Sequence, residues 1–183
     1  WDHLNLLRYS IAVGDEKERI RALKQTSDIY IINRENVDWL VTKSGIDFNF
    51  DMLIIDELSS FKSHTSKRFK SLLKIRPYFE RVVGLTGTPS SNGLMDLWAE
   101  FRVLDLGERL GRYITHYRNE YFLPDKRNGA VIFSYKPQPN AEERIYRRLA
   151  DMTISMKSTE YLKMPELILN DIEINLDEED QIK

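Results

Sequence analysis

The sequence contains no cysteine and only three histidines among its 183 residues. The lack of cysteine excludes disulfide bonds, zinc sites built on thiolates and catalysis by a thiol. The scattered histidines argue against a structural metal site. No apolar run reaches the roughly 18–20 residues that a membrane-spanning helix needs, and no signal peptide is visible. We therefore expect a soluble, cytoplasmic protein with no membrane partner.

An excess of positive charge is also missing, because the formal net charge is −2. No global field therefore indicates a nucleic-acid partner, and any contact with DNA must come from a local basic face. The apolar fraction of 42% and the charged fraction of 31% are those of an ordinary globular protein. The length suits one domain with a sizeable core.

The two ends of the chain suggest a piece of a longer protein. The chain opens on Trp1 without an initiating methionine, and residues 176–183 read as a helix that has only begun. Asp177 is a suitable N-cap for that helix, and the acids after it suit its positive start. We expect an excised fragment whose function belongs to a longer parent.

Short apolar runs alternate with helical patterns along the first hundred residues. Strands are predicted at residues 9–13, 29–32, 52–55 and 82–85, and helices at residues 15–24, around 37–41, 67–73 and 94–104. Uninterrupted apolar strands separated by helices predict an α/β fold with a mainly parallel sheet covered on both faces. Such sheets bind ligands beyond the carboxyl ends of their strands. The residues after Ile32, Ile55 and Leu85 are therefore the first candidates for chemistry.

The pattern loosens beyond residue 107. Helices are predicted at residues 109–122 and 141–152, extended segments at 131–135 and 167–176, and a loop at 125–129. The aromatic residues of this region that have helical spacing are Tyr113, Tyr117, Tyr121 and Phe122. Helical spacing favours packing in the core over stacking on bases.

Two adjacent carboxylates follow the third predicted strand. Residues 52–55 are uniformly apolar, and Asp56 and Glu57 come directly after them. Phosphoryl transfer needs a carboxylate that holds Mg²⁺ and a second group that orients the attacking water. Neighbouring acids that leave a strand in different directions can divide these roles. An acidic turn at a strand end is the simpler alternative, and this motif alone does not decide between them.

The fourth predicted strand also ends in polar residues, namely Thr86, Gly87 and Thr88, followed by Pro89. The glycine permits a tight backbone and the proline fixes the exit of the chain. The threonines can hydrogen-bond a neighbouring carboxylate or phosphate. The alternative is a plain strand–turn–helix with a hydroxyl cap. Two such strand ends, one helix apart, favour the chemical interpretation.

These residues resemble a known family. Asp56-Glu57 followed by Thr86-Gly-Thr-Pro resembles motifs II and III of superfamily 2 helicases and translocases, the first being a DEAD/DEAH-like box. The Swi/Snf branch is indicated by Lys-Ser-His-Thr-Ser-Lys at residues 62–67, by Asn92 with the Leu-Trp pair at 97–98, and by residues 31–37, which resemble motif Ib. The resemblance covers nearly the whole chain and is sharpest over residues 29–104.

The resemblance implies a RecA-like, P-loop NTPase type of three-layer fold that is truncated on its N-terminal side. The chain would be part of the first such domain of a DNA-dependent ATPase, with motif region 29–104, outer elements 105–165 and an exit strand 166–183. ATP and Mg²⁺ would be its ligands. Its partners would be DNA, in particular duplex DNA, and the second RecA-like domain of the same parent.

The resemblance also implies roles for individual residues. Asp56 would hold Mg²⁺ and Glu57 would position the lytic water, while Thr86, Gly87 and Thr88 would couple hydrolysis to DNA-contacting elements. The candidates for DNA contact are Asn33, Arg34, Glu35, Lys62 and Lys67, and Arg34 replaces the usual aromatic residue of motif Ib. An arginine there suits a phosphate contact.

Two departures from the family matter. The acidic box continues with Leu58 and Ser59, where the family usually has a small residue and a histidine; the serine hydroxyl can hydrogen-bond in place of that histidine. No glycine is followed by lysine, so the phosphate-binding loop is absent from this sequence. In the family that loop lies upstream of motif Ib. We expect that this piece alone does not turn over ATP.

Other interpretations remain open. The basic residues between Lys67 and Lys74 suit DNA, although a solvated helix face is the more common meaning of such a run. Paired acids beside Lys62 also suit a metal-dependent nuclease, which would leave residues 86–89 without a role. A non-catalytic DNA-binding or interaction module with the same fold is the third possibility. Short motor segments without large insertions are typical of a bacterial or phage source.

Overall fold

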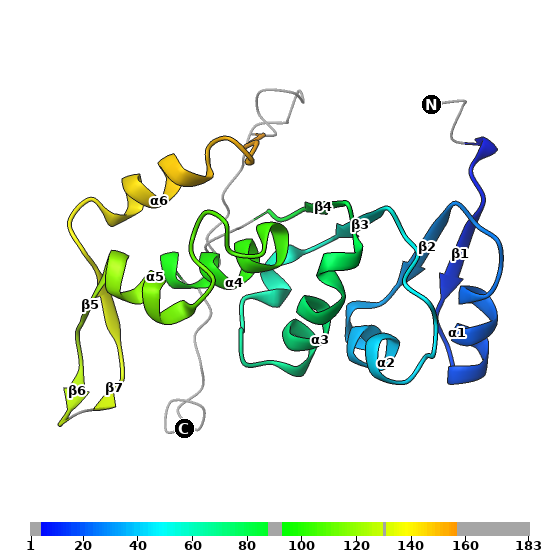
Figure 1. Ribbon diagram of the computed structural model, residues 1–183, viewed down its shortest axis with the longest axis horizontal. Helices are drawn as coiled ribbons and strands as arrows, with labels where there is room; N and C mark the ends of the chain where they lie inside the picture. Colours follow the sequence, from blue (N-terminus) through cyan, green and yellow to red (C-terminus); the bar gives the residue numbers. More distant parts are fainter. Residues whose placement is uncertain (1–4, 88–92, 130, 157–183) are drawn as a thin grey trace, which may run out of the picture. The chain divides into compact units, whose positions relative to one another are not determined.

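The computed structural model describes residues 5–87, 93–129 and 131–156. The chain divides into two compact units, residues 1–149 and 150–183, and all elements named below belong to the first. In chain order (Figure 1) they are β1 (Tyr9–Ala12), α1 (Glu16–Leu23), β2 (Ile29–Ile32), η2 (Arg34–Asn36), α2 (Val37–Thr42), β3 (Met52–Ile55), η3 (Leu58–Phe61), α3 (Lys67–Ile75), η4 (Arg76–Tyr78), β4 (Arg81–Gly84), α4 (Leu94–Asp105), α5 (Ile114–Tyr121), β5 (Phe122–Pro124), β6 (Arg127–Asn128), β7 (Val131–Ile132), β8 (Tyr135–Pro137) and α6 (Ala141–Leu149).

Parallel strand pairs dominate the first half of the chain. Strand β1 pairs with β2, and β3 pairs with β4, where Ile55 lies opposite Gly84. A helix connects the strands of each pair, as a parallel connection requires. The described part of the second half adds two small antiparallel pairs, β5 with β8 and β6 with β7. The α/β class with mainly parallel strands is therefore confirmed.

In the described part of the chain, the two parallel strand pairs carry helices on the face where β1 is buried. The described strands form separate pairs, β1–β2 and β3–β4. In β1, Ser10 and Ala12 are buried, with α1 packed on this strand (Figure 1), whereas Tyr9 and Ile11 are 66% and 49% exposed. Helix α1 thus covers the face of β1 that carries Ser10 and Ala12.

Local hydrogen bonds set where the helices begin. Asp15 caps α1 in a capping box with Glu18. The hydroxyl of Ser66 accepts a hydrogen bond from the backbone N–H of Phe69 at 3.2 Å and so starts α3. Helix α3 packs against α2, where Ser71 Oγ donates to Asp38 Oδ1 at 2.5 Å. These caps fix the first residue of α3 as Lys67.

Helix α4 is the centre of the core. Its residues 97–103 are all buried, and the helix contacts η3, β4, α3 and α5. Of the aromatic residues expected in the core, Tyr117, Tyr121 and Phe122 are buried, which confirms that prediction for them. It is wrong for Tyr113, which is 56% exposed because it precedes the first turn of α5.

Several predicted bounds shift in the second half. The helix predicted at 109–122 begins at Ile114, the helix predicted at 141–152 ends at Leu149, and the predicted loop 125–129 contains β6. Residues 88–92 and the proposed exit strand at 166–183 lie outside the described residues, so the prediction for Thr88 and for that strand is not addressed by the structure.

Candidate functional site

The two adjacent acids lie exposed at the carboxyl end of β3. Glu57 has φ 54° and ψ 62°, a left-handed conformation that costs a non-glycine residue about 1–3 kcal/mol. Its backbone N–H donates to Asp56 Oδ1 at 3.0 Å. Its carboxylate accepts a hydrogen bond from the hydroxyl of Ser59. The turn therefore holds each carboxylate through a hydrogen bond of its own.

The end of β4 reaches the same edge as the acids. The N–H of Leu85 donates to the carbonyl of Ile55 at 2.9 Å, and the N–H of Leu58 donates to the carbonyl of Leu85 at 2.8 Å. Half-buried Thr86 and exposed Gly87 follow Leu85 directly. The structure therefore brings the segment that begins at Thr86 to the acidic turn.

Glycine at position 84 makes this close approach possible. A Cβ atom on Gly84 would lie 2.7 Å from Leu58 Cδ2 and 3.1 Å from Leu104 Cδ2. Any side chain there would require the Leu58 and Leu104 side chains to shift, since the first of these separations is far below van der Waals contact. Glycine at position 84 thus leaves room for the leucine side chain that anchors the acidic turn.

Among the described residues, no group of three His, Cys, Asp or Glu side chains is placed to hold a metal ion. Mg²⁺ does not need such a group, since one or two carboxylates with phosphates and waters commonly hold it. Asp56 is exposed at the strand end, and its Oδ1 already faces the N–H of the next residue. The residues present fit a magnesium ion held by one protein carboxylate.

The predicted DNA contacts near η2 form one cluster with α3. Arg34 Nε lies 3.0 Å from Glu35 Oε1, and Arg68 Nη1 of α3 lies 3.8 Å from the same oxygen. A hydrogen bond to its carboxylate from its own backbone, and then one from Arg34, lower the pKa of Glu35. Glu35 is thus an anion that orients two arginines. Exposed Lys67 is the residue next to Arg68.

Lys62 lies in different surroundings. Its Nζ is 3.8 Å from Asp96 Oδ2 on α4, and its side chain is 34% exposed. It follows η3 directly and therefore lies between the acidic turn and α4. The structure does not bring it into the cluster of Arg34, Glu35 and Arg68.

Sequence reasoning missed a buried acid on α4. Glu100 is 1% exposed, and neither oxygen of its carboxyl has a hydrogen-bond partner among the described residues. Burial first, and then Asp96, raise the pKa of Glu100 to about 8; Glu57 acts in the same direction and Lys62 against it. Glu100 is therefore a neutral acid at pH 7. The apolar stripe of this helix carries no sign of it, because residues 97–103 are buried on every side.

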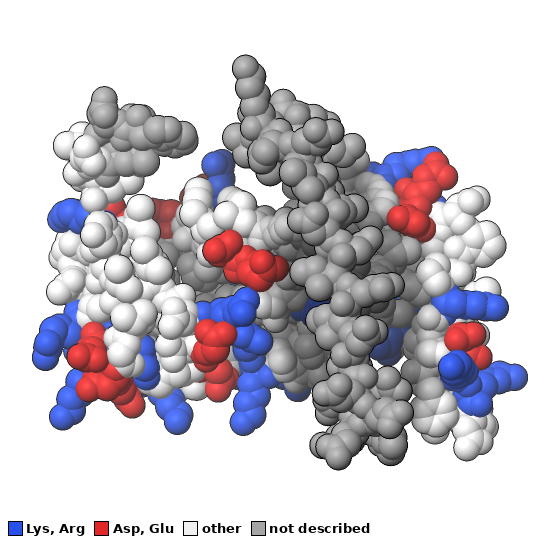
Figure 2. Space-filling model, turned by 180° about the vertical axis from the view of Figure 1, so that it is seen from behind, with Lys and Arg blue, Asp and Glu red and all other residues white. Residues whose placement is uncertain are grey.

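Basic and acidic side chains share the face of the molecule that Figure 2 shows. On the face that Figure 2 shows, Lys and Arg side chains are interspersed with Asp and Glu side chains. This mixture agrees with the net charge of −2. Binding to a polyanion would therefore depend on local groups such as the cluster at η2 and α3.

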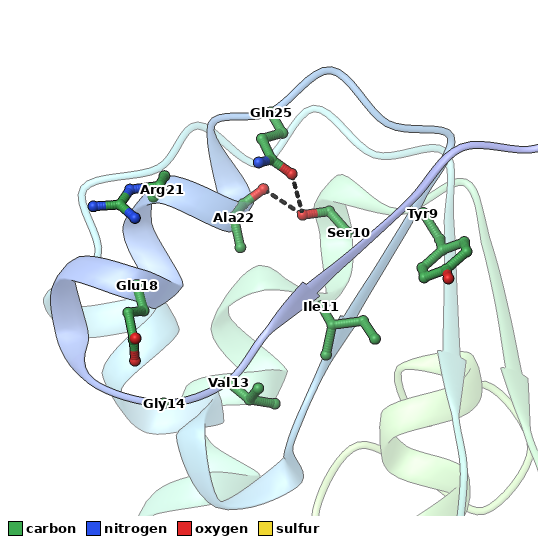
Figure 3. Close-up of a pocket in the computed structure, with 9 residues that line it drawn as sticks. All are labelled: Tyr9, Ser10, Ile11, Val13, Gly14, Glu18, Arg21, Ala22 and Gln25. Carbon is green, nitrogen blue, oxygen red and sulfur yellow. Dashed lines mark hydrogen bonds between the residues drawn. The ribbon is translucent and has the colours of Figure 1, made fainter.

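A hollow of about 350 Å³ lies between β1 and α1 (Figure 3). Ser10 Oγ there donates to the carbonyl of Ala22 at 2.6 Å and lies 3.3 Å from Gln25 Oε1. The Ser10 hydroxyl thus serves the packing of α1 on β1. In the part of the chain that the structure describes, no helix is long and apolar enough to span a bilayer.

Known proteins resemble this chain over most of its length. A family model described as "SNF2-related domain" matches residues 1–177. "Putative protein p41" of Acyrthosiphon pisum secondary endosymbiont phage 1 is 35% identical over 182 residues, which are 96% of this chain and 40% of that protein. An "Uncharacterized ATP-dependent helicase" of Mycoplasma genitalium is 24% identical over 176 residues, 93% of this chain and 15% of that protein.

A solved structure has the same fold. The "Sulfolobus solfataricus SWI2/SNF2 ATPase core in complex with dsDNA" matches with a TM-score of 0.51 and 22% identity, over 63% of this chain and 23% of that one. The likeness shows that the α/β arrangement with mainly parallel strands is that of a RecA-like ATPase core. The chain spans less than half the length of each of these three proteins.

Proposed function

Because the chain belongs to the SNF2-related family, we propose that it is part of a DNA-dependent ATPase, the motor of a helicase-like translocase that acts on duplex DNA. The observation that carries this proposal is the hydrogen-bonded joint between the acidic turn and the end of β4, in which the N–H of Leu58 donates to the carbonyl of Leu85. It connects the residues suited to hydrolysis with those suited to coupling.

Asp56 is the residue that would hold Mg²⁺, and Glu57 would accept a hydrogen bond from the water that attacks the terminal phosphate of ATP. When bound, Mg²⁺ offsets the negative charge on the phosphate oxygens. The two carboxylates have different partners, the N–H of Glu57 for Asp56 and the hydroxyl of Ser59 for Glu57, and this difference supports separate roles for the adjacent acids. Thr86, Gly87 and Thr88 would transmit the state of the nucleotide to the DNA side.

The parent protein must supply what this sequence does not contain. The phosphates need a loop with a glycine followed by lysine, and no glycine here has lysine after it. We propose that this loop and a second RecA-like domain belong to other parts of the parent. The 183-residue chain alone would then not turn over ATP.

DNA would lie against η2 and the start of α3. Arg34 and Arg68 share Glu35, and exposed Lys67 and Asn33 flank them. This group of donors suits phosphate oxygens of a DNA backbone. Lys62 would have to leave Asp96 before it could reach a phosphate. The Sulfolobus solfataricus core is in complex with dsDNA, which supports double-stranded DNA as the partner.

The test is ATP hydrolysis by the intact parent without DNA, with single-stranded DNA and with duplex DNA. We expect strong stimulation by the duplex. A folded parent that binds DNA but hydrolyses no ATP would favour a non-catalytic binding module. Cleavage of plasmid DNA with Mg²⁺ in the absence of ATP would favour a nuclease, which needs a further acidic ligand beside Asp56 and Glu57.

A further inference from the structure

The hydrogen bond between Ser59 and Glu57 is the contact within the acidic turn that involves two side chains. The Ser59 hydroxyl donates to Glu57 Oε1 across one intervening residue. Glu57 is exposed and Ser59 is half-buried in η3. The donor is thus anchored in the turn, and the acceptor reaches out of it.

Other hydrogen bonds hold the backbone of the turn. Its backbone is closed by the N–H of Ser60, which donates to the carbonyl of Glu57 at 3.0 Å, and by the N–H of Lys62, which donates to the carbonyl of Ser59 at 3.3 Å. Leu58, 3% exposed, anchors the turn in the core and to β4. The hydroxyl of Ser59 is therefore available for the carboxylate alone.

An exposed glutamate is otherwise free to change rotamer. Ordering such a side chain costs about 1.5–2 kcal/mol of conformational entropy. A group that orients an attacking water must be held within a fraction of an ångström, since small misplacements slow reactions strongly. A neighbouring hydroxyl that holds one carboxylate oxygen restricts the other oxygen as well.

We propose that Ser59 is a positioning residue that orients the Glu57 carboxylate for hydrolysis of ATP. The proposal rests on the function proposed above for Glu57. It requires that the loss of the Ser59 hydroxyl act on the chemical step, and only through Glu57. Binding of ATP and DNA would remain as they are, because the role proposed for Ser59 is confined to orienting Glu57.

The experiment compares Ser59→Ala, Ser59→Thr and Ser60→Ala in the intact parent by kcat and KM of duplex-stimulated ATP hydrolysis. Ser60 is the matched control, because its hydroxyl is buried without a hydrogen-bond partner in the described part of the chain. We expect Ser59→Ala to lower kcat about tenfold or more, as loss of a hydrogen bond to a charged group does. KM for ATP and affinity for DNA should stay unchanged. Ser59→Thr keeps a hydroxyl and should restore kcat, and Ser60→Ala should behave as wild type.

A double-mutant cycle with Glu57→Gln separates the two proposals. If Ser59 acts through Glu57, Ser59→Ala adds no further loss to the Glu57→Gln protein. Suppose that Glu57→Gln is inactive. A wild-type kcat in Ser59→Ala, or a loss of kcat that Ser59→Thr does not restore, would then overturn the role of Ser59 and leave the proposed function standing. Wild-type hydrolysis by Glu57→Gln would overturn the proposed function and the role of Ser59 with it.

Discussion

Replacement of Glu100 by glutamine should stabilise the protein increasingly as the pH rises. Glu100 lies in the centre of α4 with 1% of its surface exposed, and neither of its carboxyl oxygens has a hydrogen-bond partner among the described residues. Burial and the neighbouring Asp96 raise its pKa from the ordinary 4.5 to about 8. A glutamine has nearly the shape of the protonated acid and does not ionise, so the substitution removes the titration of this side chain and changes little else.

The sign of this pH dependence follows from the number of protons bound to Glu100 in the folded and unfolded states. Between pH 4.5 and pH 8 the folded chain holds the Glu100 proton and the unfolded chain releases it. Stability therefore falls as the pH rises through this window. Each pH unit lowers the free energy of unfolding by about 1.4 kcal/mol, which amounts to about 3 kcal/mol at pH 7. Above pH 8 the loss no longer grows, because both states are ionised.

Urea unfolding of the wild type and of Glu100→Gln from pH 5 to pH 8.5 measures this difference. The stability gained by the substitution should be small at pH 5 and grow to the order of 3 kcal/mol near neutrality. Glu142→Gln is the control, because Glu142 is exposed on α6 and its removal should give no such trend. A difference between Glu100→Gln and wild type that does not change with pH would refute a neutral, buried Glu100.

Two further predictions concern Arg76 and Lys67. Arg76 Nε donates to the carbonyl of Val103 at 2.8 Å, Nη1 to Phe79 at 3.1 Å and Nη2 to Leu104 at 2.6 Å; Arg76→Ala should therefore lower the free energy of unfolding by about 3 kcal/mol or more in urea unfolding. Arg76→Lys should recover only part of this loss, because an ammonium lacks the planar fork, and full recovery would contradict the account. Lys67→Ala in the parent should weaken DNA binding at all sequences and reduce the slope of log affinity against log salt by about 1 in fluorescence anisotropy. Lys17→Ala on α1 is the matched control, and equal slopes in the two variants would remove Lys67 from the DNA interface.

The strands and the edge of the candidate site follow from local features of the sequence. Apolar runs that stop at polar residues predict β2 and β3 to the residue and β4 within one residue. The convergence of the segments after Ile55 and Leu85 follows from parallel pairing, which brings carboxyl ends to one edge. Both signals lie within a few residues of the feature that they predict.

Contacts between distant segments are what the sequence does not reveal. The sequence predicts Arg34 to be a ligand for phosphate. In the structure Arg34 pairs with the adjacent Glu35, which also contacts Arg68, more than thirty residues further along the chain. Glu100 reads as a polar residue beside an apolar stripe, yet α4 is enclosed by η3, β4, α3 and α5.

Single-turnover hydrolysis of ATP on duplex DNA, by the intact parent and by its Glu57→Gln variant, tests the central claim most directly. ATP binding is measured on the same samples. We predict that the variant binds ATP nearly as the wild type does while hydrolysis falls by orders of magnitude. The substitution removes the carboxylate that orients the water and keeps Asp56, the ligand for Mg²⁺. Hydrolysis by Glu57→Gln at the wild-type rate would contradict the assignment of this acidic turn as the hydrolytic centre.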